Sequence, residues 1–143
     1  MQKKGLTLLE LIVVIIVIGV VASLALPRFF RLVEFSKSVG SIQSIGTIRD
    51  SMERCYMATS DYGQCRLNSP GPAPDSLDIE NPENAFNAHF GYKVNVAGAP
   101  FNYRVTATRN TFDGGTAGDT IIFSYRQDGT VTRAGTGAFS GIK

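Results

Sequence analysis

Few side chains in this 143-residue sequence are of the types that perform chemistry. His89 is the one histidine, Cys55 and Cys65 are the two cysteines, and there is no tryptophan. The sequence holds no Gly-rich phosphate loop, no Cys-x-x-Cys pair and no Ser, His and Asp set at a recognised spacing. We therefore expect that this protein is not an enzyme. The 14 basic and 12 acidic residues give a net charge of +2, so nucleic acid is not an expected partner either.

Two carboxylates, Asp113 and Asp119, flank a Gly-rich loop in the last third of the sequence. Carboxylates and backbone carbonyls are the ligands that calcium prefers, so these residues could start a calcium site. Turns also collect Asp for local backbone hydrogen bonds, and the spacing matches no recognised calcium loop. We expect no cofactor and no metal, and a calcium site at Asp113 and Asp119 is the alternative.

The two cysteines lie at the end of an expected helix and in the loop that follows it. A local disulfide between Cys55 and Cys65 is geometrically plausible. A free buried thiol at Cys55 and a metal site are the alternatives, and the metal site lacks further ligands in the sequence.

Glu10 lies inside the most apolar stretch of the chain. Between Leu6 and Leu26, 17 of 21 residues are Ala, Val, Ile or Leu. As a helix this stretch is about 31 Å long, which matches the roughly 30 Å hydrocarbon core of a bilayer. A secretory signal peptide, cleaved near Ala22–Ala25, is the alternative. The length of the run, the carboxylate within it and the helical pattern that continues beyond it favour a membrane-spanning helix.

The residues around Glu10 resemble the processing site of the type IV pilin family. A short basic leader ends in Gly5, the apolar helix begins at Leu6, and Glu10 is the fifth residue after the leader. Gly19 and Pro27 also fall at the family's spacing. The resemblance implies cleavage between Gly5 and Leu6 and N-methylation of Leu6. It also implies that Glu10 pairs with the new α-amine of its own chain or of a neighbour.

Two helix-weakening residues follow in the same stretch. Proline removes a backbone donor and clashes with the preceding turn, so Gly19 and Pro27 mark a segment that bends or partly unwinds when subunits pack, as it does in similar filaments. The resemblance also places the C-terminal part of the chain outside the cytoplasm. In that compartment a disulfide between Cys55 and Cys65 is favoured over free thiols.

The resemblance implies a structural subunit that polymerises with itself into a type IV pilus. The expected partners are a prepilin peptidase and methyltransferase and the pilus assembly machinery. The expected location is the inner membrane before assembly and an extracellular filament afterwards. The alternatives are the major pseudopilin of a type II secretion system and a DNA-uptake pilin. For the last, Lys93, Arg104 and Arg126 would form a basic patch on the sheet, although a solvated face is the simpler interpretation.

Periodicity predicts the elements that position these residues. After Pro27, apolar residues advance in steps of three and four, as on one face of an amphipathic helix. These residues are Leu32, Phe35, Val39, Ile42, Ile45, Ile48, Met52 and Cys55. Oppositely charged pairs four apart, Arg49 with Glu53 and Asp50 with Arg54, lie on the other face. Alternating apolar residues then predict three or four antiparallel strands between 88 and 133.

We therefore expect an α+β fold, in which a long N-terminal helix packs on a small antiparallel sheet. The expected divisions are a leader at 1–5, a helix at 6–58 with a membrane-spanning half at 6–27, and a globular part at 59–143. The globular part divides into a loop at 59–87, the sheet at 88–133 and a tail at 134–143, which the cysteine pair leaves without a covalent link.

Overall fold

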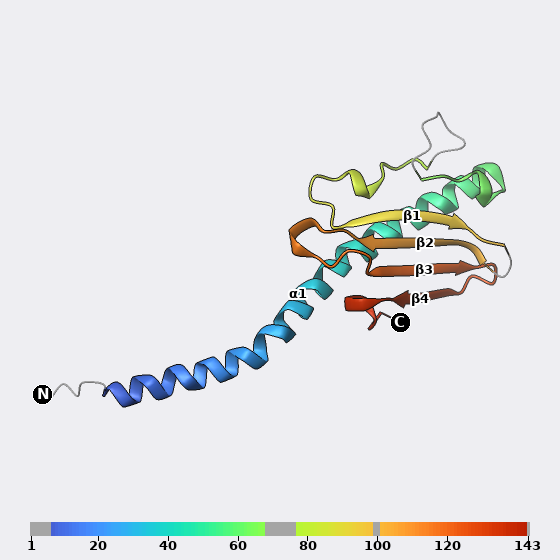
Figure 1. Cartoon of the computed structure of the whole chain (residues 1–143). Coiled ribbons are helices and arrows are strands. Elements are labelled where there is room, and N and C mark those ends of the chain that lie inside the picture. Colours follow the sequence, from blue (N-terminus) through green and yellow to red (C-terminus); the bar gives the residue numbers. More distant parts are fainter. Residues whose placement is uncertain (1–6, 68–76, 99–100, 143) are drawn as a thin grey trace, which may run out of the picture. The chain divides into compact units, whose positions relative to one another are not determined.

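The computed structural model describes residues 7–67, 77–98 and 101–142 (Figure 1). A long helix precedes four strands, in the expected α+β arrangement. The elements are α1 (Leu8–Thr59), β1 (Phe90–Val96), β2 (Phe101–Arg109), β3 (Thr120–Arg126) and β4 (Val131–Gly135). Single 3-10 turns lie at Tyr62–Gln64, Pro82–Asn84, Phe112–Gly114 and Gly137–Phe139. The chain divides after Val33 into two structural units. We call residues 7–33 the N-terminal segment and residues 34–142 the head.

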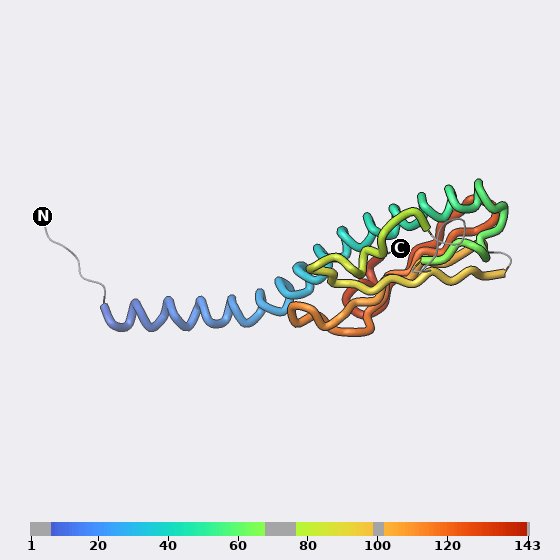
Figure 2. The backbone as a smooth tube through the Cα atoms, turned by 90° about the horizontal axis from the view of Figure 1, so that it is seen from above, coloured from blue at the N-terminus to red at the C-terminus, as the bar shows by residue number. Residues whose placement is uncertain are grey.

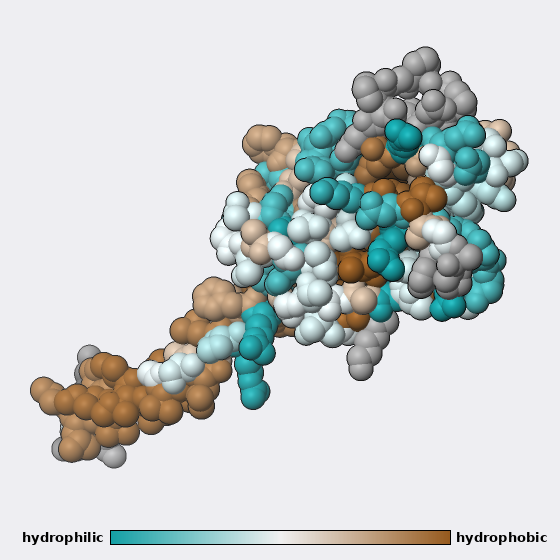
Figure 3. Space-filling view, turned by 45° about the vertical axis from the view of Figure 1, so that its right-hand side comes forward, coloured by the Kyte–Doolittle hydropathy of each residue, from teal (hydrophilic) through white to brown (hydrophobic). Residues whose placement is uncertain are grey.

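The N-terminal segment is helical from Leu8 onward and apolar on every side. Figure 3 shows brown, hydrophobic side chains over most of the visible face of this segment, together with some paler and teal ones. The helix continues through Gly19 and Pro27 without interruption. In the part of the chain that the structure describes, α1 is the one helix long and apolar enough to cross a membrane. The helix begins at Leu8, after the non-helical Thr7, whereas the sequence predicts a helix from Leu6, which lies outside the described residues.

The sheet of the head is an antiparallel meander in the order β1-β2-β3-β4. Figures 1 and 2 show residues 34–59 of α1 along one of its faces. The alternation in the sequence fixes this face, because successive strand residues point to opposite sides. Inward positions on the central strands β2 and β3, such as Val105 and Ile121, are buried. The register pairs Val94 with Val105 and Val105 with Phe123, so that one apolar row crosses three strands.

The helix contacts this sheet through a narrower stripe than the sequence predicts. Ile45, Ile48 and Met52 are fully buried in the core, as expected. The prediction was wrong for Phe35 and Val39, which are exposed. Small residues are buried one position away, at Ser38 and Ser41. Two small side chains allow the helix backbone to approach the head closely there, and this leaves the larger neighbours on the outer side.

The C-terminal tail belongs to the core. Phe139 is fully buried, with its ring centroid 5.4 Å from that of Phe90, and Ile142 is buried as well. A Cβ added to Gly135 would lie 1.9 Å from the carbonyl oxygen of Phe139, so only glycine allows the tail to fold back here. Strand β4 also runs to Gly135, beyond the expected sheet end at 133. The tail is therefore held by packing, although no covalent link reaches it.

Candidate functional site

The start of α1 carries a reciprocal cap formed by Thr7 and Glu10. The backbone N–H of Glu10 donates to Oγ1 of Thr7 at 3.3 Å, and the N–H of Thr7 donates to Oε2 of Glu10 at 3.5 Å. This is a capping box, which satisfies two backbone donors at a helix start. The sequence analysis missed Thr7, although the Thr-x-x-Glu pattern before an apolar run is its recognised signal. Glu10 therefore has a role within its own helix in addition to any partner in an assembly.

The expected cleavage site, Gly5 and Leu6, lies outside the described residues. Directly after it, apolar side chains are exposed on all sides of the helix, from Leu8 (78%) to Leu24 (72%). A Cβ added at Gly19 would meet no atom within 4 Å. Glu10 is the one acidic residue from Thr7 to Val33. The N-terminal segment thus presents an apolar surface with a single carboxylate near its start, as required of a helix packed in lipid or against other apolar helices.

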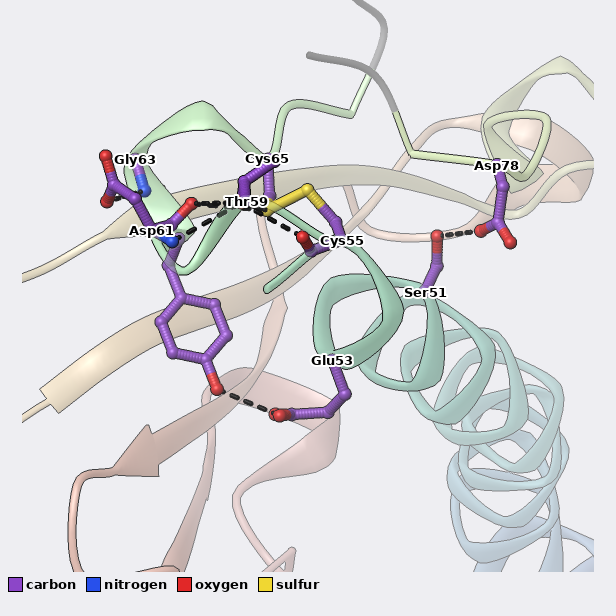
Figure 4. Close-up of a disulfide and its surroundings, with 9 residues drawn as sticks. Ser51, Glu53, Cys55, Thr59, Asp61, Gly63, Cys65 and Asp78 are labelled. Atoms are coloured by element: carbon purple, nitrogen blue, oxygen red, sulfur yellow. Dashed lines mark hydrogen bonds between the residues drawn. A yellow bond between two sulfur atoms is a disulfide. The ribbon is translucent and has the colours of Figure 1, made fainter. Parts of the chain in front are cut away.

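The expected disulfide between Cys55 and Cys65 lies at the C-terminal end of α1 (Figure 4). The Cα atoms are 5.9 Å apart and both sulfurs are in the bond, so no described cysteine is free. Thr59 donates its hydroxyl to the carbonyl oxygen of Cys55 at 2.9 Å, and Asp61 caps the turn at Tyr62–Gln64 by accepting from the N–H of Gly63. The disulfide therefore fastens the loop after α1 to the last turn of the helix.

Glu53 points into the head instead of forming the expected pair with Arg49. Its two carboxylate oxygens accept hydrogen bonds from the hydroxyls of Tyr62 and Tyr103, each at 2.9 Å. Burial raises the pKa of both phenols, and the hydrogen bonds to the Glu53 carboxylate raise it further. Arg49 instead lies over the ring of Tyr125, 5.9 Å from its centroid. A carboxylate shared by two phenols ties the helix to the sheet and to the disulfide loop.

Arg54 also has a different partner from the expected one. It donates to both carboxylate oxygens of Asp78, from Nε at 2.7 Å and from Nη2 at 2.9 Å. Ser51 donates its hydroxyl to the same carboxylate (Figure 4). The hydrogen bonds from Arg54, and secondly from Ser51, lower the pKa of Asp78 to about 2. This bidentate pair links the helix to a distant loop, and a local helix rule cannot predict it.

A second charged cluster surrounds Arg109, which is 1% exposed. Its guanidinium contacts the carboxylates of Glu34, at 3.0 Å, and Asp113, at 2.7 Å. Lys37 contacts the same two carboxylates, at 2.9 Å and 3.0 Å. The Arg109 side chain holds the pKa of both carboxyl groups below their ordinary values. His89, the single histidine, lies 3.4 Å from Asp113.

The two carboxylates of the calcium alternative have separate partners in the structure. Asp113 faces Arg109, Lys37 and His89. Asp119 accepts from the backbone N–H of Ala138 at 2.9 Å and so anchors the tail. Among residues 7–67, 77–98 and 101–142, no group of three or more His, Cys, Asp or Glu is placed to hold a metal ion. Calcium binding by this loop therefore stays a prediction, and these contacts do not favour it.

The three basic residues of the DNA-uptake alternative lie on the outer face of the sheet. Lys93 pairs across the strands with Thr106, and Arg104 pairs with Ser124, to whose hydroxyl its Nε donates at 3.0 Å. Arg126 lies 3.9 Å from Asp128. The cations are thus separated by polar residues, and two of them contact neighbours on the sheet. DNA binding by this face stays a prediction.

Comparison with known proteins places the start of the chain in a recognised group. The family described as the prokaryotic N-terminal methylation motif matches residues 1–26. Type IV major fimbrial protein FimA of Dichelobacter nodosus is 29% identical over 69 residues, which are 48% of this chain and 44% of that protein. The fimbrial protein of Moraxella nonliquefaciens is 29% identical over 77 residues, which are 54% of this chain and 47% of that protein. These matches support a relationship between this chain and the type IV pilin family.

The matched part of this chain covers less than half the length of each of these two relatives. The methylation motif contains Gly5, Leu6, Glu10 and Gly19 and ends just before Pro27. Of the residues expected to act in assembly, Glu10 and Gly19 lie within the matched segment and Pro27 lies just beyond it, and their roles stay predictions. The disulfide and the two charged clusters lie in the head, beyond the motif.

Proposed function

We propose that this chain is the structural subunit of a type IV pilus. It is cleaved after Gly5, methylated on the new α-amine of Leu6, and polymerised with copies of itself through the N-terminal segment. Before assembly this segment anchors the chain in the inner membrane, and after assembly it forms the filament core. A prepilin peptidase and methyltransferase and the pilus assembly machinery are the partners that this sequence of steps requires.

The observation that carries this proposal is the N-terminal segment itself. It combines a methylation motif at residues 1–26 with a helix whose apolar side chains are exposed around its whole circumference. Exposed apolar surface of this extent marks a membrane or protein interaction site. The lone carboxylate of Glu10 supports the assembly role, because an acid in an apolar core requires a cationic partner. A free α-amine at Leu6 supplies that cation, since its ordinary pKa is about 8.

A pilus is favoured over a secretion pseudopilus by the relatives, since the two described above are named fimbrial proteins. The outer sheet face gives no comparable support to DNA uptake, because Arg104 and Arg126 contact Ser124 and Asp128 there.

Electron microscopy of surface filaments tests the proposal. Cells that express the chain should carry filaments that yield this subunit as their main component after shearing. Deletion of the chain should remove those filaments, and its reintroduction should restore them. Filaments of unchanged number and length after deletion would contradict the proposal.

A further inference from the structure

The end of the head where α1 stops contains an open cavity of about 580 Å³. It is formed by the last turn of α1, the disulfide loop, and residues next to the ends of β1, β2 and β3. Its polar and aromatic lining residues are Tyr56, Ser60, Asp61, Tyr62, Asn102 and Gln127. All of these lining residues belong to the head.

One wall of the cavity is an aromatic surface held by a stack of tyrosines. The ring of Tyr56, 40% of whose surface is exposed, stacks on that of Tyr62, with centroids 4.3 Å apart and planes at 15°. Tyr62 packs in turn on Tyr103 at 5.0 Å, and Tyr103 stacks on Tyr125 at 4.7 Å. Tyr103 is fully buried, and its hydroxyl donates a hydrogen bond to the Glu53 carboxylate. The outermost ring is therefore a rigid apolar platform at the edge of the cavity.

The adjoining wall is fixed in an uncommon backbone conformation. Ser60 has φ of +58°, in the left-handed region that few residues other than glycine adopt. Its N–H donates to the carbonyl oxygen of Tyr56 at 2.7 Å. A left-handed residue directly after the last helical residue is a common way for an α-helix to end, and it fixes the direction in which the chain leaves α1. The disulfide between Cys55 and Cys65 closes the loop of sequence that contains Ser60 and Asp61, and it limits the freedom of this loop before any ligand binds.

The lining selects the chemical class of the ligand. It offers carboxylate and carbonyl acceptors and amide donors from Asp61, Asn102 and Gln127, beside the flat face of Tyr56. Among the residues that the structure describes, none that lines the cavity is Lys or Arg. A phosphate or sulfate group would therefore meet the Asp61 carboxylate without a compensating cation. A pyranose ring has an apolar face that can lie on an aromatic ring, and hydroxyls around its edge that both donate and accept. We propose that this cavity binds a neutral saccharide.

Saturation-transfer NMR tests the proposal on the full chain in a detergent that contains no sugar. The probes are the methyl glycosides of β-galactose, β-glucose and N-acetyl-β-glucosamine, with glucose 6-phosphate as an anionic comparison. At least one neutral glycoside should show saturation transfer, and the phosphate should show none. Absence of transfer to all three neutral glycosides, or stronger transfer to the phosphate, would overturn the proposal.

Matched variants locate the binding. Tyr56→Ala removes the aromatic platform and should lower the association constant about tenfold, at the upper end for one aromatic stacking contact. Met57→Ala, at an exposed neighbouring residue outside the lining, should leave the constant unchanged. Asp61→Asn keeps an oxygen for the Gly63 N–H, so the turn should persist while the constant falls severalfold. Equal association constants for Tyr56→Ala and Met57→Ala would overturn the proposal. A second outcome would also overturn it: Tyr56→Ala loses binding together with the near-ultraviolet circular dichroism of the head, while Asp61→Asn binds normally.

Discussion

Arg109 satisfies its buried charge with oxygens from several parts of the head. Its Nε and Nη2 donate to Glu34, its Nη2 also donates to Asp113, and its Nη1 donates to three backbone carbonyls, at His89, Asn110 and Phe112. A buried cation is tolerated only when it is paired in this way. The close approach requires glycine beside it, because a Cβ at Gly115 would lie 2.2 Å from the guanidinium.

We expect Arg109→Leu to lower the free energy of unfolding of the head by about 3–5 kcal/mol, because it leaves two carboxylates without their buried partner. Urea unfolding, followed by near-ultraviolet circular dichroism of the detergent-solubilised chain, measures this loss. Arg104→Leu is the matched control on the outer sheet face and should cost less than about 1 kcal/mol. Equal losses for the two variants would show that Arg109 does not hold the cluster together.

The same cluster predicts that the head loses stability in acid. Arg109 lowers the pKa of Glu34 below its ordinary 4.5 and that of Asp113 below its ordinary 3.8. A carboxyl group whose folded pKa is lowered stabilises the fold above its unfolded pKa, and this contribution is lost as the pH falls through the folded value. The free energy of unfolding should therefore be level above about pH 5 and fall steadily below about pH 4.5.

Chemical unfolding at a series of pH values checks this acid dependence. The double variant Glu34→Gln with Asp113→Asn should be less stable at neutral pH and show a smaller acid slope than the unmodified chain. The part of the slope that remains should come from groups such as Asp78, whose pKa is about 2. Identical slopes for the two proteins would contradict the assignment.

At the scale of elements, the disulfide joins the end of α1 to a loop that contributes few residues to the core. A bridge over a loop this short removes about 2.5–3 kcal/mol of unfolded-chain entropy in the chain-entropy model. The double variant Cys55→Ser with Cys65→Ser should therefore lower the free energy of unfolding by about that amount. Unfolding of the variant and of the oxidised protein gives the difference directly. A difference below about 0.5 kcal/mol would mean that the loop is held equally well by its other contacts.

The elements themselves could be predicted from the sequence because their signals are local. Period-two alternation in β1, β2 and β3 identified both the strands and the buried face, and the apolar run with Glu10 identified the first part of α1. Two missed features also had local signals. Thr7 stands three residues before Glu10 in a capping pattern. Arg109 occupies the next inward position after Ala107 in an otherwise apolar alternation, which marks it as a buried cation.

Other contacts could not be predicted, because they depend on how distant segments meet. The helix position of Glu53 is compatible with a side chain that faces either solvent or the core. The carboxylate faces the core because it accepts a hydrogen bond from Tyr103, which is 50 residues away. The packing of Phe139 depends on a tail that folds back at Gly135. Phe35 and Val39 continue an apolar stripe in the sequence, yet both are exposed and the neighbouring Ser38 is buried.

At the scale of the whole molecule, Glu10 has two possible partners. In the separate chain it caps its own helix with Thr7, and in a filament it would face the α-amine of Leu6. We expect Glu10→Ala to leave membrane insertion and leader cleavage intact, because it removes a charge from an apolar span and leaves the expected cleavage site at Gly5 unchanged. Assembly should fail, because an unpaired buried amine costs about 3–5 kcal/mol.

Glu10→Gln separates charge from shape. Glutamine can replace glutamate in a capping box, so this variant keeps the helix start but lacks the charge. Both variants should accumulate in the membrane in the cleaved form, with few filaments on the surface. Immunoblots of membrane and sheared fractions measure this distribution. A normal filament yield from Glu10→Gln would assign Glu10 to the helix cap alone. A normal yield from Glu10→Ala would show that assembly needs neither the charge of Glu10 nor its helix cap.

The intact mass of the subunit in sheared filaments tests the central claim most directly. Cleavage after Gly5 leaves 138 of the 143 residues, since five are removed, with Leu6 at the new terminus. The measured mass should equal that of residues 6–143 with the disulfide between Cys55 and Cys65 formed, plus one methyl group on the α-amine. A filament subunit that retains Met1 to Gly5 would contradict the account, and so would filaments in which this chain does not occur.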